Sequence, residues 1–337
     1  MTLAEAFVHR LDPWVFQFGP DIGIRWYGLS YVAGFVLGWL LMRWAAARTR
    51  SPLGREGATD LLFVAILGVM IGGRLGYALF YRREIITTFT PSFPWWDLFR
   101  LNKGGMASHG GMLGVITAAM WFSLRRKVSV RHALDILAFA TPVGLGLGRV
   151  ANFINAELPG RALPETMRAN PPGWSIKYPS EVFEFGPDRL VTLAEAMRGE
   201  VFTEQLTRTV YDRALAGDAA VLERLTPLLT PRWPSQIFQA VSDGPVLLAI
   251  LAIFWLKPRR AGTVGALFVL SYGILRIITE QFRQPDEGIA LLAGLTRGQV
   301  LSTLMVLAGG FLLWRWSRDA SSARYTIGRR PVEVAAD

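Results

Sequence analysis

The sequence GRVANFINAELPGR occupies residues 148–161 and closes an apolar run. It carries Arg149, Asn152, Asn155 and Glu157 just before a Pro-Gly break. The first three residues are spaced by three and share one helical face, whereas Glu157 falls outside that register and is expected past the helix end. Arginine offers a planar fork of donors suited to phosphate, and asparagine adds donors and acceptors beside it. The stretch therefore predicts an anion-binding site at the mouth of a membrane helix.

A second interpretation of Arg149 stays open. A lone arginine near a helix end can extend its guanidinium to the lipid headgroups and carry no chemistry. The two asparagines and the glutamate beside it favour the functional interpretation, because polar groups within a membrane segment are costly to keep there.

The composition is that of a membrane protein. Hydrophobic residues make up 51% of the 337 residues and charged residues only 18%. The net charge of +10 is explained by basic cytoplasmic loops, so no nucleic-acid partner is expected. Cysteine is absent, which excludes disulfides, thiolate metal sites and a cysteine nucleophile supplied by this chain. The first 17 residues do not have the pattern of a cleavable signal peptide.

Apolar segments of about 20 residues predict membrane spans. Seven candidates are present, at residues 24–45, 61–80, 107–124, 133–155, 234–256, 262–278 and 300–316. Arginine and lysine cluster after the first, third, fifth and seventh of them. The positive-inside rule places all four clusters in the cytoplasm, so that the N-terminus is outside and the C-terminus inside. Residues 148–161 then lie at the outer face.

The fold class is accordingly an all-α integral membrane protein with seven transmembrane helices. Residues 1–337 are expected to form a single membrane domain. Residues 156–232, rich in proline at first and with helical character over about 190–229, are expected to form a small extracytoplasmic head inserted between the fourth and fifth spans.

Further polar residues are predicted at the same outer face. The first span begins with RWYG at residues 25–28, which contains Tyr27, and the third with His109 and two glycines. The sixth ends with Tyr272, Arg276 and Glu280, spaced by four on one helical face. Glu280 is expected to hold Arg276 in place, although simple mutual neutralisation remains the alternative.

Histidine is informative because the chain has only three. His109 at a span mouth is a candidate for general acid–base chemistry, with a purely structural role as the alternative. His9 and His132 are expected to be solvated.

Glycines recur four apart in several spans, as in residues 68, 72 and 76 and residues 110 and 114. Close helix packing is the favoured interpretation. Gly73, beside Arg74, and the Gly110-Gly111 pair could instead let a ligand approach the backbone.

The stretch at residues 148–160 resembles the signature of the prolipoprotein diacylglyceryl transferase family. The segments at residues 25–28, 72–77, 109–111 and 272–286 also resemble that family, in the same order. Ala151 departs from the pattern, because the family usually has glycine there. The resemblance covers nearly all the predicted spans.

The resemblance implies a definite reaction in the bacterial inner membrane. The diacylglyceryl group of phosphatidylglycerol passes to the lipobox cysteine thiol of a prolipoprotein signal peptide, which forms a thioether and releases glycerol 1-phosphate. The active site is expected at the periplasmic face, with no metal and no cofactor. The implied catalytic residues are His109, Arg149, Arg276 and Tyr27. The implied phosphatidylglycerol-binding residues are Arg149, Asn152, Asn155, Glu157, Gly160, Tyr272, Glu280 and Arg283.

Two other function classes fit the sequence less well. A seven-span lipid or solute transporter would favour charges at the membrane midplane, whereas the predicted charges cluster towards one face. A seven-span receptor does not need two arginines and a histidine at one mouth.

Overall fold

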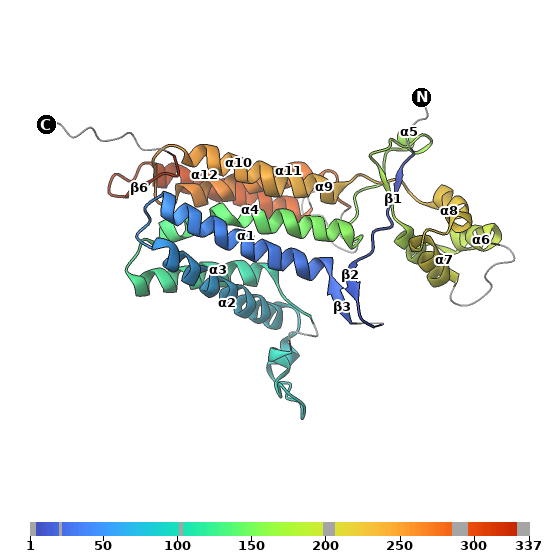
Figure 1. Cartoon of the computed structure of the whole chain (residues 1–337), viewed down its shortest axis with the longest axis horizontal. Coiled ribbons are helices and arrows are strands. Elements are labelled where there is room, and N and C mark those ends of the chain that lie inside the picture. The colour runs from blue at the N-terminus through green and yellow to red at the C-terminus, as the bar shows by residue number, and fades with distance from the viewer. Residues whose placement is uncertain (1–4, 20–21, 101–103, 198–205, 285–295, 329–337) are drawn as a thin grey trace. The chain divides into compact units, whose positions relative to one another are not determined.

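The computed structural model describes residues 5–19, 22–100, 104–197, 206–284 and 296–328, and these residues are mostly helical (Figure 1). The long helices coincide with the predicted apolar segments, because a chain in lipid must satisfy its backbone hydrogen bonds internally. They are α1 (Trp26–Arg48), α2 (Gly54–Phe80), α3 (Ser108–Arg126), α4 (Val130–Ile154), α9 (Ser235–Val241) continuing through the π-helical turn η6 (Ser242–Val246) into α10 (Leu247–Trp255), α11 (Thr263–Glu280) and α12 (Arg297–Ser317).

Six of the described helical segments are long and apolar enough to cross a membrane: α1, α2, α4, Ser235–Trp255, α11 and Gly298–Ser317 within α12. This confirms an all-α membrane protein. Helix α3 lies where the third span was predicted, but it is not one of the six. Its polar first turn and its terminal Arg125 and Arg126 lower its apolar character.

The chain divides into two compact units. Unit 1 comprises Met1–Phe35, Val143–Leu247 and Tyr272–Leu304, and unit 2 comprises Val36–Pro142, Leu248–Ser271 and Met305–Asp337. The divisions fall inside α1, α4, α10, α11 and α12.

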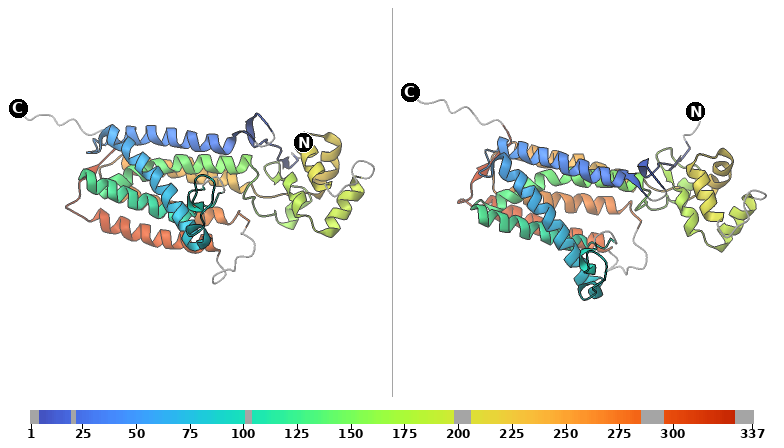
Figure 2. Two further views of the ribbon diagram at one scale, coloured as in Figure 1. Left: turned by 90° about the horizontal axis from the view of Figure 1, so that it is seen from below. Right: turned by 60° about the horizontal axis from the view of Figure 1, so that its bottom comes forward.

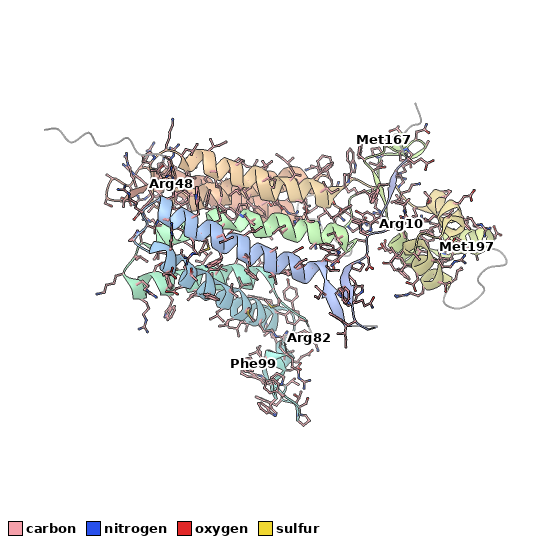
Figure 3. The ribbon with its side chains drawn as sticks, viewed as in Figure 1. Arg10, Arg48, Arg82, Phe99, Met167 and Met197 are labelled. Carbon is pink, nitrogen blue, oxygen red and sulfur yellow. The ribbon has the colours of Figure 1, made fainter. Side chains whose placement is uncertain are left out.

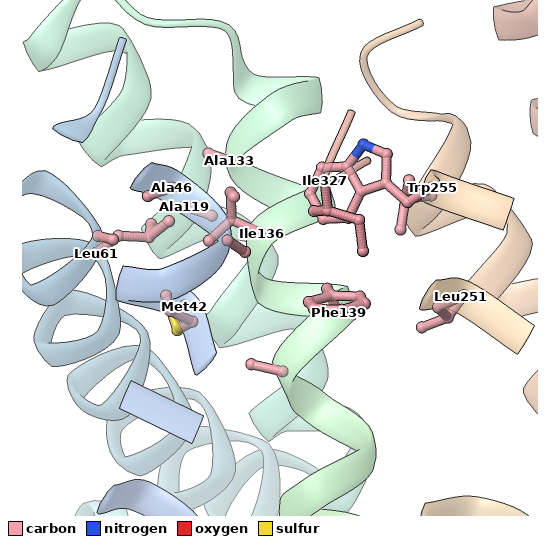
Figure 4. Packing of buried hydrophobic residues seen from close by; sticks show 14 of the residues in the cluster. Met42, Ala46, Leu61, Ala119, Ala133, Ile136, Phe139, Leu251, Trp255 and Ile327 are labelled. Carbon is pink, nitrogen blue, oxygen red and sulfur yellow. The ribbon is translucent and has the colours of Figure 1, made fainter. Parts of the chain in front are cut away.

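Unit 2 has a large apolar core, shown in Figure 4. Side chains from α1, α2, α3, α4 and α10 pack together there, among them Met42, Leu61, Ile136, Phe139 and Trp255. Helices α2 and α3 run side by side (Figures 1 and 2). A Cβ added at Gly72 or Gly114 would collide with the backbone of the facing helix, which confirms close packing as the role of this glycine stripe.

Arg74 holds the segment after α2 through its side chain. Its guanidinium donates to the carbonyl oxygens of Leu98 (2.7 Å), Gly104 (2.6 Å) and Asp97 (2.7 Å). These bonds fix the region of η1 (Arg83–Ile86) and η2 (Asp97–Phe99), where Figure 3 labels Arg82 and Phe99. The backbone of Gly73 also accepts a bond from Ala107 N at 2.9 Å.

Unit 2 also contains a polar anchor that the sequence did not reveal. The Asp135 carboxylate is 1% exposed and accepts the backbone N–H groups of Gly262 and Gly265, both at 2.7 Å. It thereby satisfies donors at the N-terminus of α11, which have no partner within their own helix. The short strands β5 (Arg259–Arg260) and β6 (Arg324–Tyr325) pair nearby.

His132 is a correction to the sequence analysis, because it is not solvated. It is 1% exposed, its Nε2 lies 2.8 Å from Ser51 Oγ, and its ring stacks on Tyr325 with centroids 3.6 Å apart. Ser51 and Tyr325, which are both distant in sequence, cover the His132 ring in the folded protein.

Unit 1 carries a second apolar core in the segment between α4 and α9. Its helices are α6 (Pro187–Ala196), α7 (Leu206–Leu215) and α8 (Ala219–Leu225), with the 3-10 turns η4 (Pro179–Glu184) and η5 (Thr226–Leu228). Buried Val182, Leu193, Val210 and Leu225 join them, and Figure 3 labels Met197 of the same cluster. The helical character expected for this segment is confirmed; its assignment as an extracytoplasmic head stays a prediction.

The remaining elements of unit 1 tie the N-terminal region to this segment. Strand β1 (Phe7–Val8) pairs in parallel with β4 (Ile176–Lys177), and β2 (Trp14–Gln17) pairs antiparallel with β3 (Gly23–Arg25) just before α1. The single-turn helix α5 (Glu165–Arg168) follows the signature stretch.

His9, also expected to be solvated, is 2% exposed and corrects a second prediction. Its Nε2 donates to Phe153 O at 2.7 Å, one of the last carbonyl groups of α4, which lack partners within the helix. Burial lowers the pKa of His9 below its usual 6.5. The folded state therefore favours the neutral ring. Because the unfolded chain binds a proton at His9 more readily, the free energy of unfolding decreases as the pH falls below 6.5.

Candidate functional site

The C-terminal end of α4 presents the polar residues of the signature stretch. The helix ends at Ile154, and Asn155 lies in the turn that follows. Glu157 lies past the helix end, as predicted, and its N–H donates to Asn152 O at 2.9 Å. In return, Asn152 Nδ2 donates to Glu157 Oε2 at 3.0 Å. The chain thus turns back on the helix, and Glu157 faces the residues that precede it.

Arg149 is paired with an aspartate that the sequence analysis missed. Its Nε donates to Asp243 Oδ2 at 3.3 Å, and the side chains are 17% and 0% exposed. Ser242 Oγ donates to Asp243 Oδ1 at 3.1 Å. The aspartate uses Nε, and the two Nη groups of Arg149 make no hydrogen bond with another described residue. The available signal was that Asp243 is the only acidic residue in the fifth predicted span.

The approach of α4 to η6 explains this pair. A Cβ added at Gly146 would lie 2.9 Å from the Gly244 Cα, so the two backbones touch at these positions. The π-helical turn carries Pro245 in its interior and presents Asp243 one residue from the contact. Such turns are frequent at functional sites.

Helix α11 supplies a second guanidinium. Arg276 Nη2 lies 2.8 Å from Glu280 Oε2, which confirms the predicted i,i+4 contact, and both side chains are about one-tenth exposed (11% and 8%). Arg276 Nη1 is buried without a hydrogen-bond partner among the described residues. The charges of Arg149 and Arg283 and the hydroxyl of Tyr272 all lie within electrostatic range of Arg276. A buried, unpartnered N–H next to a second arginine is suited to binding an anionic oxygen.

Backbone pairing brings the ends of α4 and α11 together. Gly160 forms a bridge with Arg283, Arg161 N donates to Phe282 O at 2.9 Å, and Gln284 N donates to Pro159 O at 3.3 Å. A Cβ at Gly160 would collide with the carbonyl of Trp233. Gly160 therefore lets three chain segments meet, and the structure gives it this packing role beside the binding role implied by the resemblance.

Helix α9 contributes two glutamines near the ends of α4 and α11. Gln236 Nε2 donates to Glu157 O at 2.8 Å, and Tyr178 OH donates to Gln236 Oε1 at 3.2 Å. Gln239 Nε2 and Asn155 Oδ1 are buried without hydrogen-bond partners among the described residues. These glutamines were not among the predicted site residues, although amides inside an apolar span are a usable signal.

Tyr27 lies in the first turn of α1, at the start of the same unit. Tyr31 OH donates to Tyr27 OH at 3.3 Å, and the ring centroids are 5.1 Å apart. The carboxylate of Glu157 is within electrostatic range of Tyr31. The predicted residues Tyr27, Arg149 and Arg276 therefore all belong to unit 1, together with every predicted lipid-binding residue.

His109 belongs to unit 2. It lies in the first turn of α3, and its side chain is exposed. An exposed imidazole at a helix start is accessible to a substrate, and its part in the chemistry stays a prediction.

Comparisons with known proteins show the family of this chain. The family model described as prolipoprotein diacylglyceryl transferase matches residues 13–315. A phosphatidylglycerol–prolipoprotein diacylglyceryl transferase of Bdellovibrio bacteriovorus is 37% identical over 93% of this chain and 95% of its own length. Proteins of the same name from Photorhabdus laumondii and Yersinia pestis are 38% and 36% identical, over 94% and 92% of this chain and 96% and 95% of their own lengths. The chain therefore belongs to the prolipoprotein diacylglyceryl transferase family.

Proposed function

We propose that this protein transfers the diacylglyceryl group of phosphatidylglycerol to the lipobox cysteine thiol of a prolipoprotein. The main observation is the cation set at the ends of α4 and α11, where Arg149, held by Asp243, lies within electrostatic range of Arg276, held by Glu280. The relatives are named for this reaction, and this chain matches them over nearly its whole length.

The reaction needs a thiolate and a stabilised phosphate leaving group. The substrate sulfur attacks the glyceryl carbon that bears the phosphate, so that a C–S bond forms and the C–O bond breaks. The electron pair stays on the departing oxygen, which leaves as glycerol 1-phosphate, and a base takes the thiol proton. Two guanidinium groups that already lie in place can stabilise the growing negative charge without reorganisation.

The other residues then have defined roles. Asn152 and Asn155 hydrogen-bond the headgroup, with Glu157 orienting Asn152. Arg283 adds positive charge, and the hydroxyl groups of Tyr27 and Tyr272 donate hydrogen bonds at the edge of the site. His109 accepts the thiol proton. A transporter function is not favoured, because the charged pairs lie towards the ends of α4 and α11.

The direct test is to incubate the purified protein with phosphatidylglycerol vesicles and a lipobox peptide. We expect the peptide mass to increase by one diacylglyceryl group, linked as a thioether. The matched control is the same peptide with serine in place of cysteine, which should remain unmodified. Lipid or solute flux without a thioether product would reject the enzyme in favour of the transporter.

The orientation is part of the proposal. Seven spans, with α3 as the third, place the N-terminus and residues 156–232 in the periplasm and the C-terminus in the cytoplasm. Reporter fusions at Arg48, Lys127, Arg259 and Arg324 should then report cytoplasm, and fusions at Arg161 and Pro227 periplasm. A cytoplasmic signal at Pro227 would contradict both the seven-span count and the outward-facing site.

Arg276→Ala tests the second cation. It removes the positive charge and leaves Glu280 buried without its partner, so we expect transfer to fall by at least about a hundredfold. Protein abundance should fall much less. The measurement is the rate per folded protein in the thioether assay, with Glu280→Gln as the companion variant. Equal losses of abundance and activity in Arg276→Ala would show that the ion pair is structural only.

A further inference from the structure

A polar cavity of about 430 Å³ lies in unit 1 beside the turn that follows Glu157. This volume lies within the range of small-ligand pockets, ~300–1,000 Å³. Its charged lining consists of Arg161, Arg168, Arg189, Arg232, Glu181 and Glu184. These come from the signature stretch, α5, η4, α6 and the segment before α9, so the fold brings four arginines from distant positions to one cavity.

Glu181 contacts two of these arginines. It is 5% exposed, and its Oε1 accepts Thr230 Oγ1 at 2.6 Å and Arg189 Nη1 at 2.9 Å, with Arg232 Nη2 at 3.9 Å. Its Oε2 accepts Thr230 N at 2.9 Å. Glu184, the other acid, is exposed to solvent. The four arginines and two glutamates of the lining leave an excess of two positive charges. Arg161 and Arg168 form no ion pair with Glu181.

Arg161 and Arg168 are each held by a hydrogen bond from Nε to a backbone carbonyl. Arg161 Nε donates to Arg283 O at 2.8 Å, and Arg168 Nε donates to Leu163 O at 2.7 Å. Each guanidinium is thus anchored through one nitrogen, and its two Nη groups make no hydrogen bond among the described residues. Arg161 is half-buried and Arg168 is exposed. Two such forks on one cavity match the oxygens of a phosphate group, because arginine binds phosphate through paired N–H bonds.

The cavity shares its wall with the candidate active site. Arg232 Nη1 donates to Gly160 O at 3.3 Å and also contacts Gln284 Oε1. Arg161 is paired through its backbone with Phe282 and Trp233. The chain segment that separates the two sites is therefore the short turn from Glu157 to Arg161, and a small anion leaving one site is close to the other.

We propose that this cavity is a second site for a phosphate ester of glycerol, separate from the site at Arg149 and Arg276. The ester is either the free glycerol phosphate released by the transfer or the headgroup of an anionic phospholipid. The first source rests on the proposed function. The net positive charge of the cavity favours an anionic phosphate from either source. If the source is the free ester, which approaches a dianion, the cavity draws it away from the reacting centre.

The first experiment measures binding to the full-length protein in nanodiscs of zwitterionic lipid. The probes are radiolabelled glycerol 1-phosphate and inorganic phosphate, in equilibrium dialysis. Wild-type protein should bind glycerol 1-phosphate saturably, and Arg168→Gln should weaken this binding at least about tenfold through loss of one charge-assisted fork. The matched control is Arg208→Gln, which removes an exposed arginine of α7 outside the cavity.

The second experiment identifies the source. A photoreactive amino acid replaces Ala162, which lines the cavity, and the nanodiscs contain labelled phosphatidylglycerol. A lipid crosslink that Arg168→Gln removes assigns the site to the headgroup. Saturable glycerol phosphate binding without a lipid crosslink assigns it to the free ester.

The proposal is overturned if neither probe binds and no lipid crosslinks, or if the Arg168→Gln and Arg208→Gln proteins behave alike. It is also overturned if an acidic peptide, but not glycerol phosphate, displaces inorganic phosphate, because the cavity would then bind peptide. The thioether assay on the same protein in nanodiscs that contain phosphatidylglycerol separates the two claims. A thioether product without phosphate binding rejects only this site, and phosphate binding without product rejects only the proposed function.

Discussion

Arg149→Lys is expected to lower diacylglyceryl transfer by at least about a hundredfold, although the charge is kept. In the native structure the Nε atom binds Asp243 at 3.3 Å, and the guanidinium keeps two Nη groups as further donors. Lysine is a point charge with a single nitrogen, so it cannot bind Asp243 and present a bidentate donor to phosphate at the same time. The measurement is the initial rate of thioether formation with phosphatidylglycerol vesicles.

The matched control is Arg208→Lys on α7, where the arginine forms an exposed ion pair with Asp212 and no effect is expected. Near-normal turnover by folded Arg149→Lys protein would reduce Arg149 to an anchor at the headgroup layer. Asp243→Asn refines the test, because it keeps the shape and removes the charge that positions Arg149. We expect about a tenfold loss, ~1.4 kcal/mol, mainly in kcat. Ser242→Ala, which only frees Asp243 Oδ1, should lose less.

His109→Gln is expected to lose most activity at neutral pH and to recover part of it as the pH rises. The attacking sulfur must become a thiolate, and a free cysteine thiol has a pKa of about 8.5. Glutamine can replace a hydrogen bond of the imidazole but cannot accept the proton. At higher pH the thiol ionises unaided, so the general base becomes less important. The measurement is the pH profile of kcat/KM for both proteins, within the range where they stay folded.

The competing role for His109 predicts a different profile. If the imidazole only hydrogen-bonds the headgroup, the loss is uniform over pH and accompanied by weaker phosphatidylglycerol binding. A lipobox peptide with selenocysteine provides a further control, because its selenol is ionised at neutral pH. This substrate should restore His109→Gln towards the wild-type rate if His109 is the base, and should not do so if His109 binds lipid.

The local parts of the site were predictable from the sequence. Arg149 and Asn152 share a face of α4, Glu157 lies past its end, and Arg276 contacts Glu280 at 2.8 Å. Each of these follows from helix periodicity and a nearby Pro-Gly break, which depend on a few consecutive residues. The membrane class follows in the same way from apolar runs, because any chain crossing lipid must satisfy its own backbone hydrogen bonds.

The tertiary structure decided which distant side chains meet. Asp243 reaches Arg149 because Gly146 and Gly244 let two backbones touch, and no periodicity within either segment contains that information. His9 and His132 were expected in solvent and are buried, because Phe153 and Ser51, 144 and 81 residues away, complete their surroundings. Burial and pairing over such separations depend on the free energy of packing whole helices, whereas helix formation and membrane preference are properties of each segment alone.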